Sequence, residues 1–484
     1  MRLSDILRDI PVLETNVSPD TECTGITYDS RAVKRGDLFV AVKGYATDGH
    51  RFIASALEKG AAAVLCEDAP AEGAPFVRIE NTRLGLALAA ANFYRHPAKE
   101  LKVIGITGTN GKTTTAFLVK QLLEKTLGAK VGLVGSICNM IGAEELHTEH
   151  TTPESCDLQA LFREMADAGC GYCVMEVSSH SLVLDRVAGI PFAVGVFTNL
   201  TQDHLDFHKT MEEYARAKSL LFTHCAAACA NLDDGWESAV LKDAACPVLT
   251  FAAEDRNADL TAQNIRLSPA GVYFEAEEGG ERCPVTLGIP GRFSVYNGLT
   301  ALAVCRLLGI PLAAAAAALA ECRGAKGRVE SVPTGGEYSI FIDYAVTPDA
   351  IENVLTTLRQ VAPARLVMLF GCGGDRDRKK RPIMGEISAR LADFVIVTSD
   401  NPRTERPEDI IAEILPGVER GGAPFTVIPD RIEAIEWAIE HHEKDDVILL
   451  CGKGHEDYQI IGHEKIHMDE REIVADCLAR RAGK

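Results

Sequence analysis

The sequence contains no run of about 18 apolar residues, and its start, MRLSDILRDIPVLE, has no apolar centre of the kind that signal peptides carry. Basic residues are also in deficit, with 50 against 69 acidic residues and a net charge of −19. This balance argues against nucleic acid as a partner, because phosphate backbones need a basic surface. It remains compatible with a locally basic site for a small anion. These absences predict a cytoplasmic chain without a membrane span.

A second CxxC pair is missing as well. The 15 cysteines are scattered, and the single CxxC, Cys170 to Cys173, leads directly into the apolar segment YCVMEV. Zinc sites normally require two such pairs. We therefore predict reduced thiols and a structural role for this CxxC. No internal repeat of 20 to 50 residues is present.

Three stretches of the chain alternate apolar strand patterns with segments of helix length. The 484 residues are too many for a single core. The alternation predicts an α/β fold with parallel sheets and three domains, residues 1–98, 99–327 and 328–484. The central domain is expected to be a P-loop ATPase-type parallel sheet, and the last a Rossmann-like doubly wound domain. Residues 258–288 predict short β pieces that form an insertion or small lobe. Strands are predicted at 38–44, 61–67, 101–107, 130–136, 172–177, 192–200, 339–345, 365–371, 393–399 and 447–452, and helices at 112–127 and 313–318.

The segment GITGTNGKTT, residues 105–114, predicts a phosphate-binding loop. The strict pattern GxxxxGK[ST] fails, because its first glycine is displaced to Gly105. A buried strand, glycines and a helix N-terminus still favour ATP phosphates, and the alternative is an ordinary glycine-rich turn. Lys112 is expected to reach the β- and γ-phosphates, and Thr113 to bind Mg²⁺. The predicted ATP-binding residues of the loop are Gly108, Thr109, Asn110, Gly111, Lys112, Thr113 and Thr114.

Polar residues follow two further predicted strands. Glu176 and His180 end one strand, and Asp203, His204 and His208 follow another. The carboxyl ends of parallel strands face the ligand crevice, so Glu176 and His204 could hold magnesium near the γ-phosphate. Each is also explained as a hydrogen-bonded polar residue at a strand end.

Lys218 lies within the apolar stripe of a predicted helix at 210–222. The stripe comprises Met211, Tyr214, Ala215, Leu221 and Phe222. A buried ammonium is costly unless it is paired or neutralised. Lys218 either extends to solvent or is converted to a carbamate, which would be an anionic metal ligand.

The motifs GTNGKTT, MEVSSH, TNLTQDHLDFH and YARAKSLLF resemble those of the Mur ligase family, from about residue 25 to residue 472. Members add amino acids to a UDP-linked peptidoglycan precursor. The resemblance implies that the first domain holds the uridine nucleotide through Ser30 and Arg31. It also implies contacts from later residues to the muramyl peptide. These are Thr151, Thr152, Ser178 and Arg186.

The resemblance also assigns the ATP site. Lys218 matches the lysine that is carbamoylated in the family. The implied cofactor is Mg²⁺, held by Thr113, Glu176, His204 and the Lys218 carbamate. The implied catalytic residues are Lys112, Glu176, His204 and Lys218, and the further nucleotide contacts are Asn297, Arg328 and Asp343.

The segment SDNPRTE matches family members that add meso-diaminopimelate. Diaminopimelate has a carboxylate at its far end that Arg403 can grip bidentately, whereas lysine would present an ammonium there. The alternatives are a ligase that adds lysine or another diamine, a folylpolyglutamate synthase, and a P-loop regulatory switch or binding module that hydrolyses ATP slowly. The implied amino-acid site consists of Arg376, Asp400, Asn401, Pro402, Arg403, Gly452 and Glu456.

Two departures from the family pattern concern the third domain. Val346 replaces the histidine of DYAHTPD, and Arg378 and Lys379 stand where a lysine–glycine pair is common. The basic run GGDRDRKKRP predicts either a solvated loop or a contact to phosphate. The expected partners are small-molecule substrates only, the chain is expected to be a monomer, and the third domain is expected to close on binding.

Overall fold

A computed structural model describes residues 1–44, 47–71 and 73–482. The chain forms two compact units. Unit 1 comprises Met1–Leu260 and Thr300–Ala315, and unit 2 comprises Thr261–Leu299 and Ala316–Lys484.

The first part of unit 1 is a five-stranded sheet in the order β1-β5-β4-β3-β2. Its strands are parallel except for β1, which pairs antiparallel with β5. Residues of α1 and α3 share one core with the sheet, and α2 packs on the opposite face. The elements are α1 (Leu3–Ile6), β1 (Glu14–Thr15), β2 (Gly25–Thr27), β3 (Asp37–Val40), η1 (Gly49–Phe52), α2 (Ile53–Glu58), β4 (Ala63–Cys66), β5 (Phe76–Arg78), α3 (Thr82–Phe93) and η2 (Pro97–Lys99).

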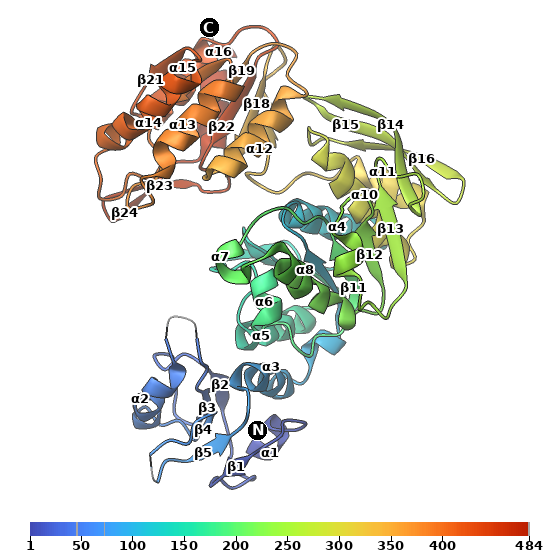
Figure 1. The fold of residues 1–484 in the computed structure, drawn as a ribbon, viewed down its shortest axis with the longest axis vertical. Helices are drawn as coiled ribbons and strands as arrows, with labels where there is room; N and C mark the ends of the chain where they lie inside the picture. Colours follow the sequence, from blue (N-terminus) through green and yellow to red (C-terminus); the bar gives the residue numbers. More distant parts are fainter. Residues whose placement is uncertain (45–46, 72, 483–484) are drawn as a thin grey trace. The chain divides into compact units, whose positions relative to one another are not determined.

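The second part of unit 1 is built on strands in the order β13-β12-β11-β6-β10-β7-β8-β9, and β6 lies between β10 and β11. Helices α5 and α8 share a core with one face, and α4 packs against β6, β7 and β10 (Figure 1). The β-strands are β6 (Lys102–Thr107), β7 (Val131–Val134), β8 (Asn139–Ile141), β9 (Glu144–Leu146), β10 (Tyr172–Glu176), β11 (Phe192–Phe197), β12 (Ala228–Asn231) and β13 (Val248–Ala252). The helices are α4 (Lys112–Leu127), α5 (Ser155–Asp167), α6 (Ser179–Val183), α7 (Leu205–His208), α8 (Met211–Ser219), η3 (Leu220–Thr223) and α9 (Glu237–Val240).

The first part of unit 2 contains three β-strands, of which β15 and β16 pair antiparallel. Polar and apolar residues alternate along β16, which leaves one side of it exposed. The strands are β14 (Leu260–Ser268), β15 (Gly271–Glu278) and β16 (Glu281–Leu287). The two helices that follow, α10 (Phe293–Leu307) and α11 (Leu312–Leu319), each belong partly to unit 1 and partly to unit 2.

The second part of unit 2 is a sheet in the order β17-β18-β22-β19-β20-β21, parallel except for β17. Helices α12, α13 and α14 lie side by side on one face, and α15 and α16 cover the other (Figure 1). The elements are β17 (Glu330–Val332), β18 (Ser339–Asp343), α12 (Pro348–Arg359), β19 (Leu366–Phe370), α13 (Lys380–Leu391), β20 (Phe394–Val397), α14 (Pro407–Gly421), β21 (Phe425–Val427), α15 (Arg431–Glu440), β22 (Val447–Cys451), β23 (Tyr458–Ile461), β24 (Glu464–His467) and α16 (Glu470–Ala482).

The predicted α/β fold class is confirmed, with corrections to particular elements. Residues 258–288 form strands of nine, eight and seven residues rather than short pieces. Several predicted strands end early, because their last residues leave the sheet to form loops; β3, for example, ends at Val40. The three domain boundaries stay predictions. Among the described residues, no helix is both long and apolar enough to cross a membrane.

Candidate functional site

The predicted phosphate-binding residues connect β6 to α4. Gly111 precedes the helix with a left-handed φ of 83°, which favours glycine at this position. The amides of Thr109 and Asn110 donate to the backbone and side-chain oxygens of Asn199, at 2.8 and 2.9 Å. The first-turn N–H groups of a helix have no intrahelical partner, so this end of α4 suits a phosphate.

Gly105 lies inside strand β6 and not in the loop, which corrects the prediction that the loop begins there. A Cβ atom on Gly105 would lie 2.6 Å from the Phe192 ring, so packing against β11 explains this glycine. Gly108 is the loop glycine, since a Cβ on it would lie 1.9 Å from Thr198 Oγ1 at a φ of +148°. The two glycines therefore have different roles.

Alanine substitutions should separate these roles. Gly108→Ala must displace the loop, and we expect ATP affinity to fall about 10-fold or more. Gly105→Ala overpacks the strand and should cost about 1–3 kcal/mol of stability. Titration calorimetry with a non-hydrolysable ATP analogue and thermal unfolding measure the two effects. Unchanged ATP affinity in a folded Gly108→Ala variant would show that the loop tolerates the side chain.

Lys218 is buried beneath this loop, with 1% of its surface exposed, so the alternative in which it extends to solvent is wrong. Its Nζ donates to the Gly108 carbonyl at 2.8 Å and lies 4.3 Å from the centre of the Tyr214 ring. Lys112 Nζ donates to the same carbonyl at 3.0 Å and to the Thr109 carbonyl at 2.8 Å. Burial, and then the charge of Lys112, lower the pKa of Lys218 well below its usual value. Folding therefore favours the neutral, nucleophilic amine at Lys218.

Glu176 lies at the end of β10 with 1% of its surface exposed, and its carboxylate accepts several hydrogen bonds. Thr113 Oγ1 donates to Oε2 at 2.9 Å, and the Ser136 amide donates to Oε1 at 2.8 Å. The Ser136 hydroxyl lies 3.2 Å from Oε2 and 2.9 Å from Thr151 Oγ1. The Glu176 carboxylate therefore connects the first turn of α4 with the residues that follow β7, and through Ser136 with Thr151 of the predicted muramyl-peptide site.

The residues predicted to hold magnesium are only partly gathered. Thr113 and Glu176 present adjacent oxygen atoms, the ligand type that Mg²⁺ prefers. The His204 ring lies 6.1 Å from the Tyr214 ring, which also contacts Lys218. Among the described residues, no three His, Cys, Asp or Glu side chains form a group that could hold a metal ion. The donor set therefore fits Mg²⁺ only with the Thr113 hydroxyl and an anionic Lys218.

Three histidines lie together beside this cluster. His180 contacts the rings of His204 and His208 at 4.9 and 5.6 Å, and His208 stacks on Tyr214. Nε2 of the buried His208 lies 2.8 Å from Ser179 Oγ. Burial is the largest of the causes that lower the pKa of His208 to about 4. The folded protein therefore keeps this imidazole neutral.

His208 should make stability depend on pH. The unfolded chain protonates this histidine at its usual pKa of about 6.5, whereas the folded chain does so only near 4, so the unfolded state binds more protons between these values. Its contribution to stability is present above about pH 6.5 and is lost as the pH falls toward 4. We expect the thermal midpoint of His208→Gln to depend less on pH across this window than that of the wild type. Parallel pH profiles would refute the assignment.

The predicted muramyl-peptide residues meet next to Glu176. Thr152 Oγ1 donates to the Glu176 carbonyl at 2.8 Å and accepts from the Ser178 amide at 3.2 Å. Arg186 donates to the Thr152 carbonyl at 3.0 Å and forms an ion pair with Glu154 at 2.8 Å. Four predicted residues from three positions along the chain therefore converge: Thr151 with its neighbour Thr152, Ser178, and Arg186.

Ser30 and Arg31, the predicted uridine contacts, lie in the loop after β2. The Ser30 carbonyl accepts from Lys59 Nζ at 2.8 Å, and Arg31 is exposed and paired with Asp29 at 2.8 Å.

Asp343 organises the start of the second part of unit 2. Its carboxylate accepts from the amides of Val329 and Ala345, both at 2.8 Å. The Arg328 guanidinium lies 5.5 Å from the Tyr344 ring, and burial raises the pKa of Asp343. Asn297 is buried on α10.

Asn401, Lys453 and Glu456 form a compact polar group at the carboxyl end of this sheet. The fully buried Lys453 Nζ donates to Asn401 Oδ1 at 2.8 Å and to Glu456 Oε2 at 2.6 Å. Asn401 Nδ2 donates to Glu456 Oε2 at 2.9 Å. Asp400 Oδ1 accepts from the Asn401 amide at 2.6 Å. Asp400 Oδ2 is buried and faces Gly452, and it has no hydrogen-bond partner among the described residues. Five residues of two loops thus form one site.

Arg403 has a left-handed φ of 52°, and its Nη1 donates to the Gly374 carbonyl at 2.8 Å. Arg376 is exposed. Both arginines lie beside Gly373, because a Cβ atom added to this glycine would be 2.9 Å from Arg403 Nη1 and 3.6 Å from Arg376 Cγ. Arg378 is exposed and pairs with Glu413. The solvated-loop alternative for the basic run is therefore favoured at Arg378.

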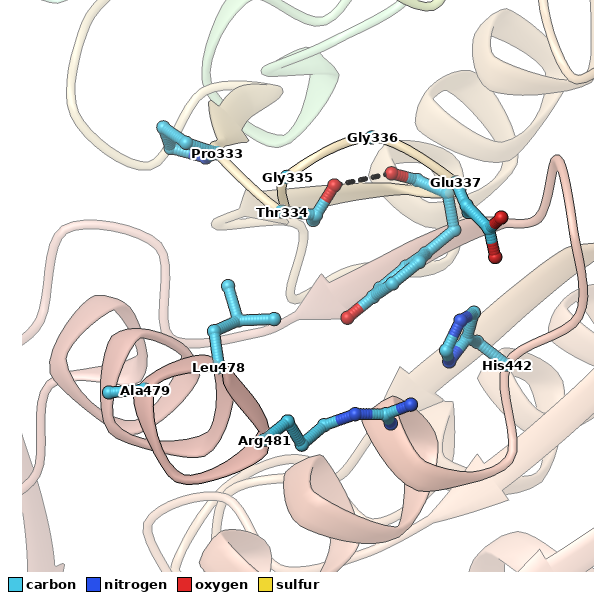
Figure 2. A pocket seen from close by; sticks show the side chains of 10 residues that line it. Pro333, Thr334, Gly335, Gly336, Glu337, His442, Leu478, Ala479 and Arg481 are labelled. Atoms are coloured by element: carbon cyan, nitrogen blue, oxygen red, sulfur yellow. Dashed lines mark hydrogen bonds between the residues drawn. The ribbon is translucent and has the colours of Figure 1, made fainter. Parts of the chain in front are cut away.

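A cavity of about 580 Å³ lies elsewhere in unit 2 (Figure 2). The loop at 333–337 lines one side, and Leu478 and Arg481 of α16 line another. The Tyr338 and His442 rings lie 3.9 Å apart in its wall. None of the predicted site residues lines this cavity, which lies at the amino end of β18, opposite Asp343.

Three residues of these clusters escaped the sequence prediction. Ser136 follows β7, the neighbour of β10, and its position at a strand end was the available signal. Asn199 follows β11 and orders the phosphate loop. Lys453 stands between two glycines at the end of β22, but its burial and partners depend on residues distant in sequence.

Family models match most of the chain. The Mur ligase middle domain matches residues 106–305, the Mur ligase glutamate ligase domain matches 327–454, and the Mur ligase family catalytic domain matches 22–94.

Full-length relatives and a solved structure agree with these matches. A protein of Caldanaerobacter subterraneus subsp. tengcongensis is 48% identical over 99% of both chains, and one of Clostridium botulinum is 46% identical over 94% of this chain and 95% of that one. Both bear the name UDP-N-acetylmuramoyl-L-alanyl-D-glutamate–2,6-diaminopimelate ligase. A solved structure of the same name is 31% identical, with a TM-score of 0.76 over 100% of this chain and 99% of that one.

Proposed function

Because this chain belongs to the Mur ligase family, we propose that it joins meso-2,6-diaminopimelate to UDP-N-acetylmuramoyl-L-alanyl-D-glutamate in an ATP-dependent reaction. The observation that carries the proposal is Lys218, buried against the phosphate-loop carbonyl of Gly108. A P-loop switch needs no such lysine, whereas a ligase must neutralise the charge of a phosphoryl group moving onto a carboxylate.

Unit 1 activates the acid. The free carboxylate of the D-glutamate residue attacks the γ-phosphorus of ATP and forms an acyl phosphate, and ADP leaves. Lys112 and the N-terminus of α4 stabilise the transferring phosphoryl group electrostatically. Thr152, Ser178 and Arg186 orient the muramyl peptide beside Glu176.

Lys218 acts as a carbamate in this proposal. Its neutral amine attacks CO₂, a nitrogen–carbon bond forms, and one proton leaves to solvent. The product is an anion beneath the phosphate loop, close to Lys112, and an anion at this position would attract a metal cation. Thr113, Glu176, His204 and the carbamate would hold Mg²⁺, which supplies charge neutralisation for the phosphates.

Unit 2 supplies the nucleophile. Asp400, Asn401, Glu456 and Gly452 bind the amino-acid end of diaminopimelate, and Arg403 with Arg376 binds its distal carboxylate. The amine attacks the acyl carbon, the carbon–oxygen bond to phosphate breaks, and the amine releases a proton as the amide forms.

ADP release by the full-length chain tests the proposal. We expect rapid release only when ATP, the UDP-muramyl dipeptide and diaminopimelate are all present, together with one new amide product. Slow ATP hydrolysis that is indifferent to the amino acid would identify a switch and reject the ligase.

A further inference from the structure

Arg431 is a fully buried arginine on α15 that lies behind both loops of the amino-acid site. Its Nη1 donates to the Ser399 carbonyl at 3.1 Å, and its Nη2 donates to the Cys451 carbonyl at 2.9 Å. Ser399 directly precedes Asp400, and Cys451 directly precedes Gly452. One guanidinium therefore fixes the starting point of both loops.

The two anchored loops follow strands β20 and β22, which are not neighbours in the sheet. The sheet order places β19 between β20 and β22, so no ladder hydrogen bond joins the ends of β20 and β22. Arg431 bridges these ends with its planar fork of donors, a geometry that lysine lacks. The bridge sets the spacing between Asp400 and Gly452, where a Cβ on the glycine would lie only 2.7 Å from Asp400 Oδ2.

Glu470, the first residue of α16, holds this guanidinium in place. Its Oε1 accepts from Arg431 Nε at 2.9 Å and from Nη2 at 2.8 Å, and both side chains are fully buried. A buried ion pair is a weak source of stability, since apolar residues of similar volume often do as well. The two carbonyl contacts offer a better reason for its presence here.

We propose that Arg431, held by Glu470, is a positioning residue that sets the separation of the 400–403 and 452–456 loops and so tunes affinity for diaminopimelate. The inference rests on the proposed function of those loops. It predicts a defect specific to the amino acid, because Arg431 contacts the backbone carbonyls that directly precede Asp400 and Gly452.

Steady-state kinetics of the full-length Arg431→Lys variant test this inference. A displacement of about 1 Å in a binding group can cost about 100-fold, so we expect the KM for diaminopimelate to rise about 10- to 100-fold. At saturating diaminopimelate kcat should change little, and the KM values for ATP and the muramyl dipeptide should stay near those of the wild type. A folded variant with a normal KM for diaminopimelate would overturn the proposal.

Arg365→Lys is the matched control. Arg365 pairs with the buried Asp446 through Nε and Nη2, but at the amino ends of β19 and β22. It should leave the KM for diaminopimelate unchanged, and an equal rise would assign the effect to general loosening of the sheet and reject a specific role.

The double variant Arg431→Met with Glu470→Met separates positioning from folding, because it removes both charges together. We expect this double variant to unfold at the same temperature as the wild type and still to show a raised KM for diaminopimelate. If both Arg431 variants misfold while Arg365→Lys folds, the pair is a folding element and the proposal fails.

Arg403→Ala serves as the reference variant for the amino-acid pocket. A normal KM in Arg403→Ala rejects the pocket itself, whereas a raised KM there with normal Arg431 variants rejects only the positioning role.

Discussion

Lys218→Ala is expected to lower the ligation rate by about 1,000-fold, because it removes the anionic group that we propose beneath the phosphate loop. The fold should survive, since the substitution removes a buried amine whose desolvation is itself unfavourable. Initial rates of ADP release at saturating substrates measure the loss. A rate within a few-fold of the wild type would contradict any catalytic role for this lysine.

Chemical rescue distinguishes a carbamate from an ammonium at this position. A short carboxylic acid such as acetate fits the space left in Lys218→Ala and restores the negative charge, so activity should partly return. Lys112→Ala is the matched control, because Lys112 contacts the same Gly108 carbonyl but acts as a cation. It should be similarly inactive and gain nothing from acetate. Equal behaviour of the two variants toward acetate would contradict the carbamate.

Arg403→Ala is expected to lower kcat/KM for diaminopimelate about 100-fold or more, because it removes the bidentate contact that we propose to the distal carboxylate. Affinity for ATP should not change, because Arg403 is not among the residues that we expect to bind ATP. Activity with L-lysine should fall much less, so discrimination between the two amino acids narrows. Competition assays with both amino acids measure the ratio.

Arg378→Ala controls for a general loss of positive charge in this region. Arg378 is exposed and pairs with Glu413, and its removal should leave kcat/KM within a few-fold of the wild type. If Arg378→Ala and Arg403→Ala reduced diaminopimelate use equally, long-range charge would explain the effect and the pocket assignment would be wrong.

Local patterns made part of this site predictable. The order strand, glycines, Lys-Thr-Thr and helix lies within residues 101–127, and the structure forms β6 and α4 there. Lys218 was conspicuous because its helix carries a regular apolar stripe, and its burial follows from that stripe. A charge inside an apolar pattern is visible in sequence because the period of a helix is fixed.

Long-range packing was not predictable from the sequence. Gly105 looked like a loop glycine because no local pattern reveals the Phe192 ring on the neighbouring strand. Arg431 carried no signal, since its partners Ser399, Cys451 and Glu470 meet only through the strand order. Strand order depends on the whole domain, whereas turn chemistry depends on a few residues.

The structure gives one physical account of the departure at Val346. The Val346 carbonyl accepts from Lys380 Nζ at 2.8 Å. This contact uses the backbone, so replacing a histidine by valine leaves it intact. The contact also ties the loop after β18 to the first turn of α13, independently of the side chain at this position.

The most direct test of the proposed function compares two amino acids in one assay. ADP release is measured with ATP, the UDP-muramyl dipeptide and either meso-diaminopimelate or L-lysine, and the amide product is identified by mass. We predict product with diaminopimelate. The kcat/KM for lysine should be lower than that for diaminopimelate by about 100-fold or more, because Arg403 would face an ammonium. Lysine used as well as or better than diaminopimelate would contradict the account.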